Sequence, residues 1–312
     1  MLRFSSGHVN VPLLVVEDLS QKRLIIVTGK GGVGKTTVAA ALALQSAREG
    51  RRTLVCEVNT QERIATLLGR PPAGPDIASL EENLWAVDVR PQEAMHEYAL
   101  MILKFERIYN AVFQNKVMQY FLRFIPSLQE LVMLGKILFH LREKRPDGSP
   151  RFERIIIDAP ATGHAITFFS VPQVILDTVP PGAMADEALW MRDLLVDPKT
   201  TGVVLVSLPE ELPVNETLEL AATLGSKVHL TCSLVVLNGA IASRFTPAEV
   251  EATAATALGP TTHTHEFRAA ASTTSRERLA TLGVPVVTVP RLFADPFGRK
   301  AIEQIAATLG AA

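Results

Sequence analysis

The stretch that decides the fold is GKGGVGKTT, residues 29–37, which carries two lysines, Lys30 and Lys35. Its first eight residues fit the pattern G-x-x-x-x-G-K-[ST], which forms a phosphate-binding loop when it lies between a strand and a helix. Here the apolar run RLIIVT (23–28) precedes the pattern, and a helical pattern over 35–48 follows it. Backbone N–H groups of such a loop turn inward around an anion, and the helix N-terminus adds its dipole. The sequence therefore predicts a nucleotide-binding loop.

Short apolar runs alternate with helical patterns along most of the chain. Strands are expected at 23–28, 52–58, 84–89, 152–158, 202–207, 230–238 and 284–289. Helices are expected at 35–48, 214–224, 246–257 and 295–309. Most of the strand runs are apolar on both faces, which is typical of strands covered by helices on each side. The alternation predicts an α/β fold of the P-loop NTPase type, with a mostly parallel central sheet flanked by helices.

Residues 92–143 interrupt this alternation, because they contain no strand pattern and read as helices broken near Pro126. We expect them to form a helical insert subdomain, with residues 1–91 and 144–312 forming the P-loop NTPase domain. The insert is rich in methionine and phenylalanine: Met95, Met101, Met118, Met133, Phe105, Phe113, Phe121, Phe124 and Phe139. Flexible methionines suit grooves for varied apolar partners, but the same residues also suit the packing of helices onto the domain. Both interpretations stay open.

Composition narrows the class of protein and its partners. The 312 residues carry a formal net charge of −1, so no global charge favours nucleic acid or anionic lipid, and no nucleic-acid partner is expected. The two cysteines, Cys56 and Cys232, lie far apart in sequence, which fits a reducing compartment. No apolar stretch reaches the roughly 18 residues that a membrane helix needs. We expect a cytoplasmic protein.

Lys35 and Thr36 follow the glycines of the loop, and Asp158 ends the apolar run RIIID. In a phosphate loop the lysine reaches the β- and γ-phosphates, and the hydroxyl coordinates Mg²⁺. A carboxylate at a strand end supports Mg²⁺, usually through a water, although an Asp there is also often a helix cap. Gly163 lets the backbone approach a γ-phosphate. The nucleotide-binding residues expected in the loop are Gly29, Lys30, Gly31, Gly32, Val33, Gly34, Lys35, Thr36 and Thr37, with Thr36 and Asp158 as metal ligands.

Several segments together resemble one family of ATPases. KGGVGKTT, with a lysine at the second motif position, is similar to the deviant phosphate loop of one branch of P-loop proteins. The segments that narrow the resemblance are DAPATGHAITFFSVP (158–172), LPEELPVNETLEL (208–220), VVLNGA (235–240) and VPRLFADPFG (289–298). Together they resemble the arsenite-pump and tail-anchored-protein-targeting ATPases. A partition- or division-type ATPase of the same branch is the alternative.

The resemblance implies ATP or ADP with Mg²⁺ as the ligand and a dimer as the working unit. The family's second-position lysine, here Lys30, reaches across the dimer interface to the partner's nucleotide, which makes Lys30 a catalytic candidate. Asn238 would recognise the adenine, with Pro290 and Leu292 in the base-side loop. The resemblance implies a homodimer or a heterodimer with a related ATPase. It also implies that the insert holds a hydrophobic client segment or a membrane-associated partner.

Asn59 is a departure from the family pattern, which places an Asp after the second strand to orient or activate the attacking water. A carboxamide accepts a hydrogen bond from water but cannot take its proton. One interpretation is slow or absent hydrolysis, with the chain serving as the regulatory half of a pair. The other is a shift in alignment, with Glu57 or Glu62 in the catalytic role, or an Asn that orients water adequately. Whether the chain hydrolyses ATP efficiently stays open.

The histidines give weaker signals. His263 and His265 alternate in TTHTHEF, which favours an exposed strand face over a metal pair. His140 lies among apolar helix residues and is expected to be packed. The family resemblance makes His164 a switch-loop residue.

Overall fold

The computed structural model describes residues 19–58, 62–91, 94 and 128–310, and an eight-stranded sheet forms its centre. The strands are β1 (Leu24–Gly29), β2 (Thr53–Val58), β3 (Ala78–Glu81), β4 (Leu84–Val89), β5 (Arg154–Asp158), β6 (Thr201–Ser207), β7 (Cys232–Ala240) and β8 (Val286–Pro290). Their order across the sheet is β3-β4-β2-β5-β1-β6-β7-β8. Every neighbouring pair is parallel except β3 and β4. The predicted α/β class with a mostly parallel sheet is confirmed.

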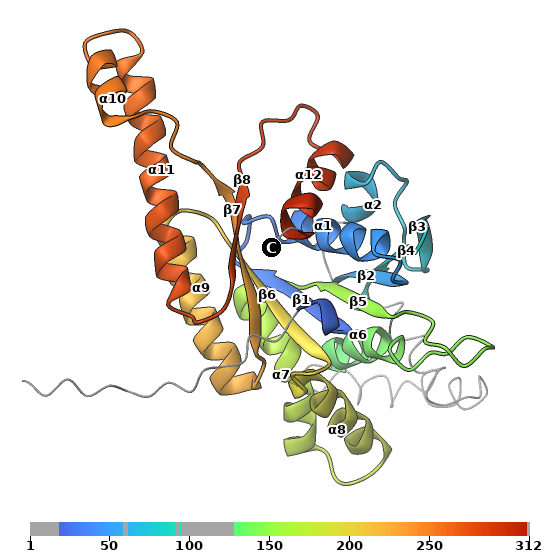
Figure 1. Cartoon of the computed structure of the whole chain (residues 1–312). Helices are drawn as coiled ribbons and strands as arrows, with labels where there is room; N and C mark the ends of the chain where they lie inside the picture. The colour runs from blue at the N-terminus through green and yellow to red at the C-terminus, as the bar shows by residue number, and fades with distance from the viewer. Residues whose placement is uncertain (1–18, 59–61, 92–93, 95–127, 311–312) are drawn as a thin grey trace, which may run out of the picture.

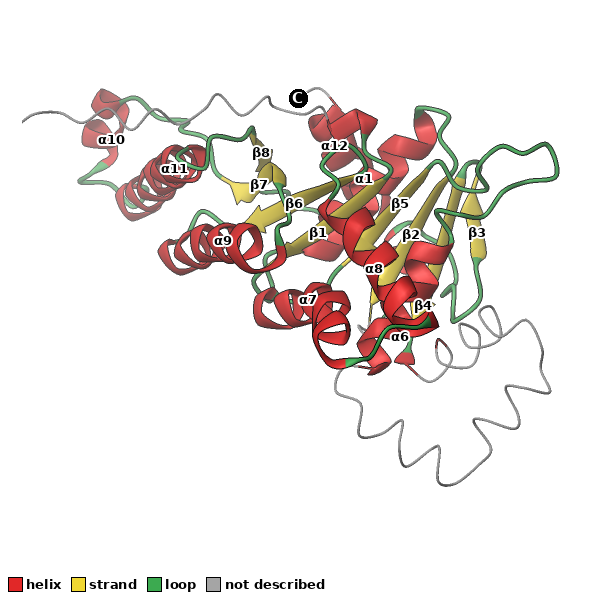
Figure 2. Cartoon of the chain, turned by 90° about the horizontal axis from the view of Figure 1, so that it is seen from below, coloured by secondary structure: helices red, strands yellow, loops and turns green. Residues whose placement is uncertain are grey.

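Helices cover both faces of the sheet (Figures 1 and 2). One face carries α1 (Lys35–Arg48), α2 (Ile64–Leu67) and α12 (Arg299–Gly310). The other face carries α6 (Leu128–Phe139), α7 (Thr162–Thr178), α8 (Ala183–Val196), α9 (Glu211–Thr223) and α11 (Gly259–Ala280), with α10 (Pro247–Thr253) before α11. Two short helical turns, Leu19–Gln21 and Leu224–Val228, complete the described elements. Among the described helices, none has both the length and the apolar character needed to cross a membrane.

The sheet separates two hydrophobic cores. Successive strand residues point to opposite faces, so Ile25 and Val27 of β1 pack in the core beneath α1, while Leu24 and Ile26 pack in the core beneath α7. All four side chains are fully buried or nearly so. This explains why the strand runs are apolar at every position rather than at alternate positions.

The strands predicted from the sequence match the observed ones within two residues at each end. The prediction omitted β3, whose four residues ASLE pair antiparallel with β4. The chain reverses between them at Asn83, which adopts a positive φ of 59°. Asn tolerates this conformation better than most residues, but a four-residue strand with mixed polarity gives too weak a pattern to be recognised.

The prediction that His263 and His265 lie on an exposed strand face is wrong. Both lie in α11, a helix of 22 residues that begins with Pro260 in its first turn. The alternation of the two histidines is incidental, because the helix-favouring run RAAASTTSRERLA that follows extends one helix through them. His265 Nε2 contacts the carbonyl oxygen of Ala242 at 3.0 Å.

Of the predicted insert, only Ala94 and residues 128–143 are described. There α6 is buried in the core beneath α7, with Leu134 and Ile137 fully covered and Met133 nearly so. His140 follows α6 and is buried, with Nδ1 2.6 Å from Glu143 Oε2, which confirms the prediction that it is packed. Met95, Met101 and Met118, on which the client groove depended, lie outside the described residues, as does most of the 92–143 segment. The division into two domains stays a prediction.

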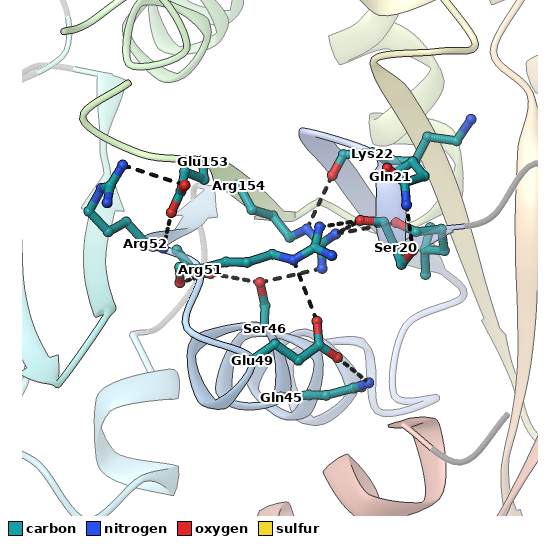
Figure 3. Close-up of polar contacts among 12 residues, drawn as sticks. Ser20, Gln21, Lys22, Gln45, Ser46, Glu49, Arg51, Arg52, Glu153 and Arg154 are labelled. Carbon is teal, nitrogen blue, oxygen red and sulfur yellow. Dashed lines mark hydrogen bonds and ion pairs between the residues drawn. The ribbon is translucent and has the colours of Figure 1, made fainter. Parts of the chain in front are cut away.

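At the N-terminal edge of the strands, the buried Arg154 forms hydrogen bonds to the segment before β1 and to α1 (Figure 3). Arg154 of β5 donates from Nε to the carbonyl oxygen of Lys22 at 3.1 Å and from Nη1 to Ser46 Oγ of α1 at 3.3 Å. Its Nη2 donates to the carbonyl oxygen of Ser20, which also accepts from Arg51. These bonds fix the entry into β1 and the end of α1, the two elements that flank the phosphate loop at the opposite edge.

Candidate functional site

The glycine-rich loop lies at the carboxyl edge of the sheet, between the end of β1 and the start of α1 (Figure 1). Strand β1 lies between β5 and β6 and pairs in parallel with both. Ligands of open parallel sheets bind beyond the carboxyl ends of the strands. Helix α1 begins at Lys35, so its unpaired N–H groups and the positive end of its dipole point to the loop. The strand–loop–helix context expected for residues 29–37 is present.

At two glycines of the loop a side chain would clash with a neighbouring atom, which is a backbone oxygen at Gly29 and a side-chain amide at Gly34. A Cβ at Gly29 would lie 2.3 Å from the carbonyl oxygen of Val206. A Cβ at Gly34 would lie 2.3 Å from Asn238 Nδ2, and Gly34 also has a positive φ of 94°. The Asn238 amide donates from Nδ2 to the carbonyl oxygen of Val33 at 2.8 Å. The end of β7 therefore holds the phosphate loop directly.

Lys35 points into the loop that precedes it. Its Nζ donates to the carbonyl oxygen of Lys30 at 3.0 Å. Partial burial lowers the pKa of Lys35, and the nearby charge of Asp158 partly offsets that effect. An anion favours the charged form of a buried ammonium. The loop thus places a desolvated cation where a phosphate group would compensate it.

Thr36 and Asp158 meet beneath the loop. Thr36 Oγ1 donates to Asp158 Oδ2 at 2.6 Å. Asp158 is 1% exposed, and its Oδ1 is buried without a hydrogen-bond partner among the described residues. Burial raises the pKa of Asp158 to about 6, although the bond from Thr36 opposes the shift. A hydroxyl and an unsatisfied carboxylate oxygen are the hard ligands that Mg²⁺ prefers, so the two residues fit the predicted metal role.

Glu57 adds a second buried carboxylate beside Asp158. In the register of the sheet Glu57 of β2 lies opposite Asp158 of β5 and, on its other side, opposite Asp88 of β4. The carboxylate of Glu57 accepts backbone N–H bonds from Arg63 at 2.7 Å and from Ile64 at 3.2 Å. Burial, with a smaller contribution from Asp158, raises the pKa of Glu57 to about 7. The sequence suggested Glu57 only as a substitute for Asn59, and its strand register with Asp158 required the structure.

Lys30 forms an ion pair within its own chain. Its Nζ lies 2.8 Å from Glu216 Oε1 on α9, and both side chains are less than one-third exposed. The other oxygen, Glu216 Oε2, is buried without a hydrogen-bond partner among the described residues. Nothing in the sequence pattern indicates this contact, because the two residues are 186 positions apart. Asn59, the other catalytic candidate, lies outside the described residues.

The residues expected on the base side gather at the same edge of the sheet. Asn238 pairs with Val289 in the β7–β8 register, and Pro290 follows opposite Ala240. A cavity of about 670 Å³ opens beside them and is lined in part by Gly239, Arg278 and Arg291. Leu292 differs, because it packs against the core beneath α1. Asn238 and Pro290 thus lie near the phosphate loop, whereas Leu292 supports the loop's surroundings.

His164 and Gly163 occupy the first turn of α7, where both are exposed. The resemblance had indicated a switch loop for this segment, but here it is helical from Thr162 onward. The preceding Ala161 is extended, so the irregular backbone is confined to the few residues between Asp158 and the helix.

Comparisons with known proteins agree with this arrangement. The family model described as "Anion-transporting ATPase" matches residues 22–180, about half of the chain. The chain is 32% identical over 239 residues to "ATPase BagA" of Mycobacterium tuberculosis, covering 74% of this chain and 69% of the relative. It is 25% identical over 246 residues to "Putative arsenical pump-driving ATPase" of Halobacterium salinarum, covering 72% of this chain and 37% of the relative. It is 23% identical over 285 residues to "ATPase ARSA1" of Chlamydomonas reinhardtii, covering 72% of this chain and 36% of the relative.

Proposed function

Because the chain belongs to the anion-transporting ATPase family, we propose that it is a nucleotide-driven switch that closes as a dimer around ATP and Mg²⁺. The observation that carries the proposal is the Thr36–Asp158 contact directly beneath Lys35 at the start of α1. The residues proposed to bind the phosphates and the metal are thus neighbours at the carboxyl edge of the sheet, which supports the proposal. An ATPase of this family binds its nucleotide at such a loop.

In this proposal the backbone N–H groups of residues 31–36 bind the phosphates, and the Lys35 ammonium neutralises the β- and γ-oxygens. The Thr36 hydroxyl and the Asp158 carboxylate would hold Mg²⁺, which would supply positive charge to offset that of the phosphates. Asn238 holds the loop through Val33 and faces the adenine with Pro290. Each role rests on a residue type suited to it and on the shared position at one edge of the sheet.

Lys30 is proposed to act across the dimer interface. Its ammonium is only partly exposed and is engaged by Glu216, so this contact must open before Lys30 can reach a second nucleotide. The added positive charge would stabilise the transition state of phosphoryl transfer. Identical or related subunits both satisfy this geometry, and the partner is either a second copy or a related ATPase.

Hydrolysis by the dimer depends on what replaces the family's water-activating Asp. Asn59 supports a slow turnover in which ATP maintains a long-lived closed state, or a regulatory half that depends on a competent partner. Replacement of Asn59 by Asp should then raise turnover markedly. An unchanged rate in Asn59→Asp would show that this position does not limit hydrolysis.

A client or partner is proposed to bind the 92–143 insert when the dimer closes. Transport of an arsenical, which the names of some relatives suggest for those proteins, is not part of the proposal. Cys56 is fully buried on β2, and burial raises its pKa far above the usual range. Cys232 lies on β7, also with a raised pKa, of about 12. Neither thiol forms the low-pKa, accessible site that binds soft ions.

The test is to purify the chain, add ATP with Mg²⁺, and follow molecular size and phosphate release in the same samples. The proposal predicts ATP-dependent dimerisation and Mg²⁺-dependent release that is reduced in Lys30→Ala. The Lys30→Ala variant should still bind nucleotide, because Lys35 and the backbone of the loop remain. A monomer at all ATP concentrations, with phosphate release equal to the buffer background, would contradict the dimeric switch.

A further inference from the structure

Glu57 and Asp158 place two carboxylates side by side in the interior. They are register partners on the adjacent parallel strands β2 and β5, whose backbones lie about 4.8 Å apart. Register partners point to the same face, and here it is the face beneath α1, because their second neighbours Val55 and Ile156 both belong to that core. Each of the two acidic residues is 1% exposed.

Such an arrangement is electrostatically costly without a cation. Ionised carboxylates repel each other, and burial removes the water that would screen them. In the described part of the chain neither Glu57 nor Asp158 lies within ion-pair distance of a lysine or an arginine, although the nearby charge of Lys35 stabilises ionised Asp158 in part. Glu57 accepts hydrogen bonds from the backbone N–H groups of Arg63 and Ile64, and these bonds stabilise its charge only in part. Asp158 Oδ1 has no hydrogen-bond partner in the same described residues.

The geometry points to Glu57 as a further group that holds the divalent cation of the nucleotide site, beside Thr36 and Asp158. This inference rests on the proposed function, because the cation is the one that accompanies the nucleotide. Both oxygens of Glu57 already accept hydrogen bonds from the start of α2. Glu57 therefore acts by accepting a hydrogen bond from the hydration shell that Mg²⁺ characteristically retains. Outer groups of this kind typically contribute about 10- to 100-fold to metal affinity.

Glu57 also sets a preference between two forms of the nucleotide. A second negative charge beside Asp158 disfavours the metal-free nucleotide, which carries its full phosphate charge into the site. The same charge favours the nucleotide with its cation bound. Glu57 is therefore a positioning residue that makes nucleotide binding depend on the cation, and it links the site to the first residues of α2.

The experiment measures the dissociation constant of a fluorescent ADP analogue in the presence of Mg²⁺ and again in the presence of EDTA. The readout is the dissociation constant in EDTA divided by that in Mg²⁺, which is the factor by which the cation strengthens binding. The ratio in Glu57→Gln is expected to fall by about 10-fold from that of the wild type. Glu57→Asp keeps the charge but withdraws it by one methylene, so a smaller fall than that of Glu57→Gln is expected. Binding of Mn²⁺ to the ADP complex, followed by electron paramagnetic resonance, should weaken in parallel.

The matched control is Glu153→Gln. Glu153 also accepts a backbone N–H group, from Arg52 at 3.0 Å, but it precedes β5 at the opposite edge of the sheet. A purely structural role for Glu57 would change both dissociation constants together and leave their ratio unchanged, as is expected for Glu153→Gln. An unchanged ratio in Glu57→Gln, or in Glu57→Asp if the Gln variant does not fold, overturns the inference. A wild type that binds no nucleotide would instead overturn the proposed function.

Discussion

Replacement of Glu216 by Gln tests whether α9 restrains Lys30. The ion pair is 2.8 Å long, and its two side chains are 29% and 30% exposed. Pairs in such partly solvated positions contribute about 0.2–1 kcal/mol, and about 1 kcal/mol corresponds to a roughly fivefold change in an equilibrium. We therefore expect Glu216→Gln to change the free energy of unfolding by less than about 1 kcal/mol. The fraction of protein with a released Lys30 should rise by about 1.4- to fivefold.

The readouts are the ATP concentration that half-saturates dimerisation, measured by light scattering, and the rate of phosphate release. In Glu216→Gln the half-saturating ATP concentration should fall, and the rate of phosphate release should rise, each by a factor of about 1.4 to 5, because the cost of opening the contact is removed. Glu219→Gln is the matched control, since Glu219 is exposed on the same helix and its loss changes the net charge equally. If phosphate release in Glu216→Gln instead fell to the level of Lys30→Ala, Glu216 would be a required partner of Lys30 and not a restraint.

Gly34→Ala should lower the free energy of unfolding by about 1–3 kcal/mol and abolish nucleotide binding in calorimetry, because its Cβ would lie 2.3 Å from Asn238 Nδ2 at a φ of 94°. Asn238→Ala removes the bond to Val33 and should cost about 1 kcal/mol in chemical denaturation, together with a weaker affinity for ATP. The third prediction concerns pH. Because the pKa of Asp158 rises from 3.8 to about 6 on folding, its contribution to stability is present below about pH 4 and is lost as the pH rises through 6. The free energy of unfolding of the wild type, relative to that of Asp158→Asn, should therefore fall by up to about 3 kcal/mol between pH 4 and pH 7 in metal-free buffer. A constant difference would contradict the burial argument.

Much of the fold could be predicted from sequence because its elements are strongly patterned. Uniformly apolar runs predicted seven of the strands, and the motif at residues 29–37 predicted where the chain turns from β1 into α1. By contrast, β3 is too short and too polar to stand out. Helix α11 was not predicted, because His263 and His265 in its first two turns alternate by coincidence and were interpreted as a strand.

The contacts of the site depended on register and on long-range packing, which a single sequence does not reveal. The pairing of Glu57 with Asp158 follows from the insertion of β5 between β2 and β1. The contact of Lys30 with Glu216 needs α9 to lie against the phosphate loop. Thr36 and Asp158, whose types and motif positions indicate a metal site, lie in direct contact at 2.6 Å, and their metal role stays a prediction.

The central claim is that the loop between β1 and α1 binds ATP through Lys35, and calorimetric titration with ATP and Mg²⁺ tests it most directly. The account predicts saturable binding to the wild type at one site per chain. It also predicts a loss of at least about 10-fold in affinity for Lys35→Ala, because a charge-assisted contact to phosphate contributes about 1.5–3 kcal/mol. Equal affinities for the two proteins, or no heat of binding in the folded wild type, would contradict it.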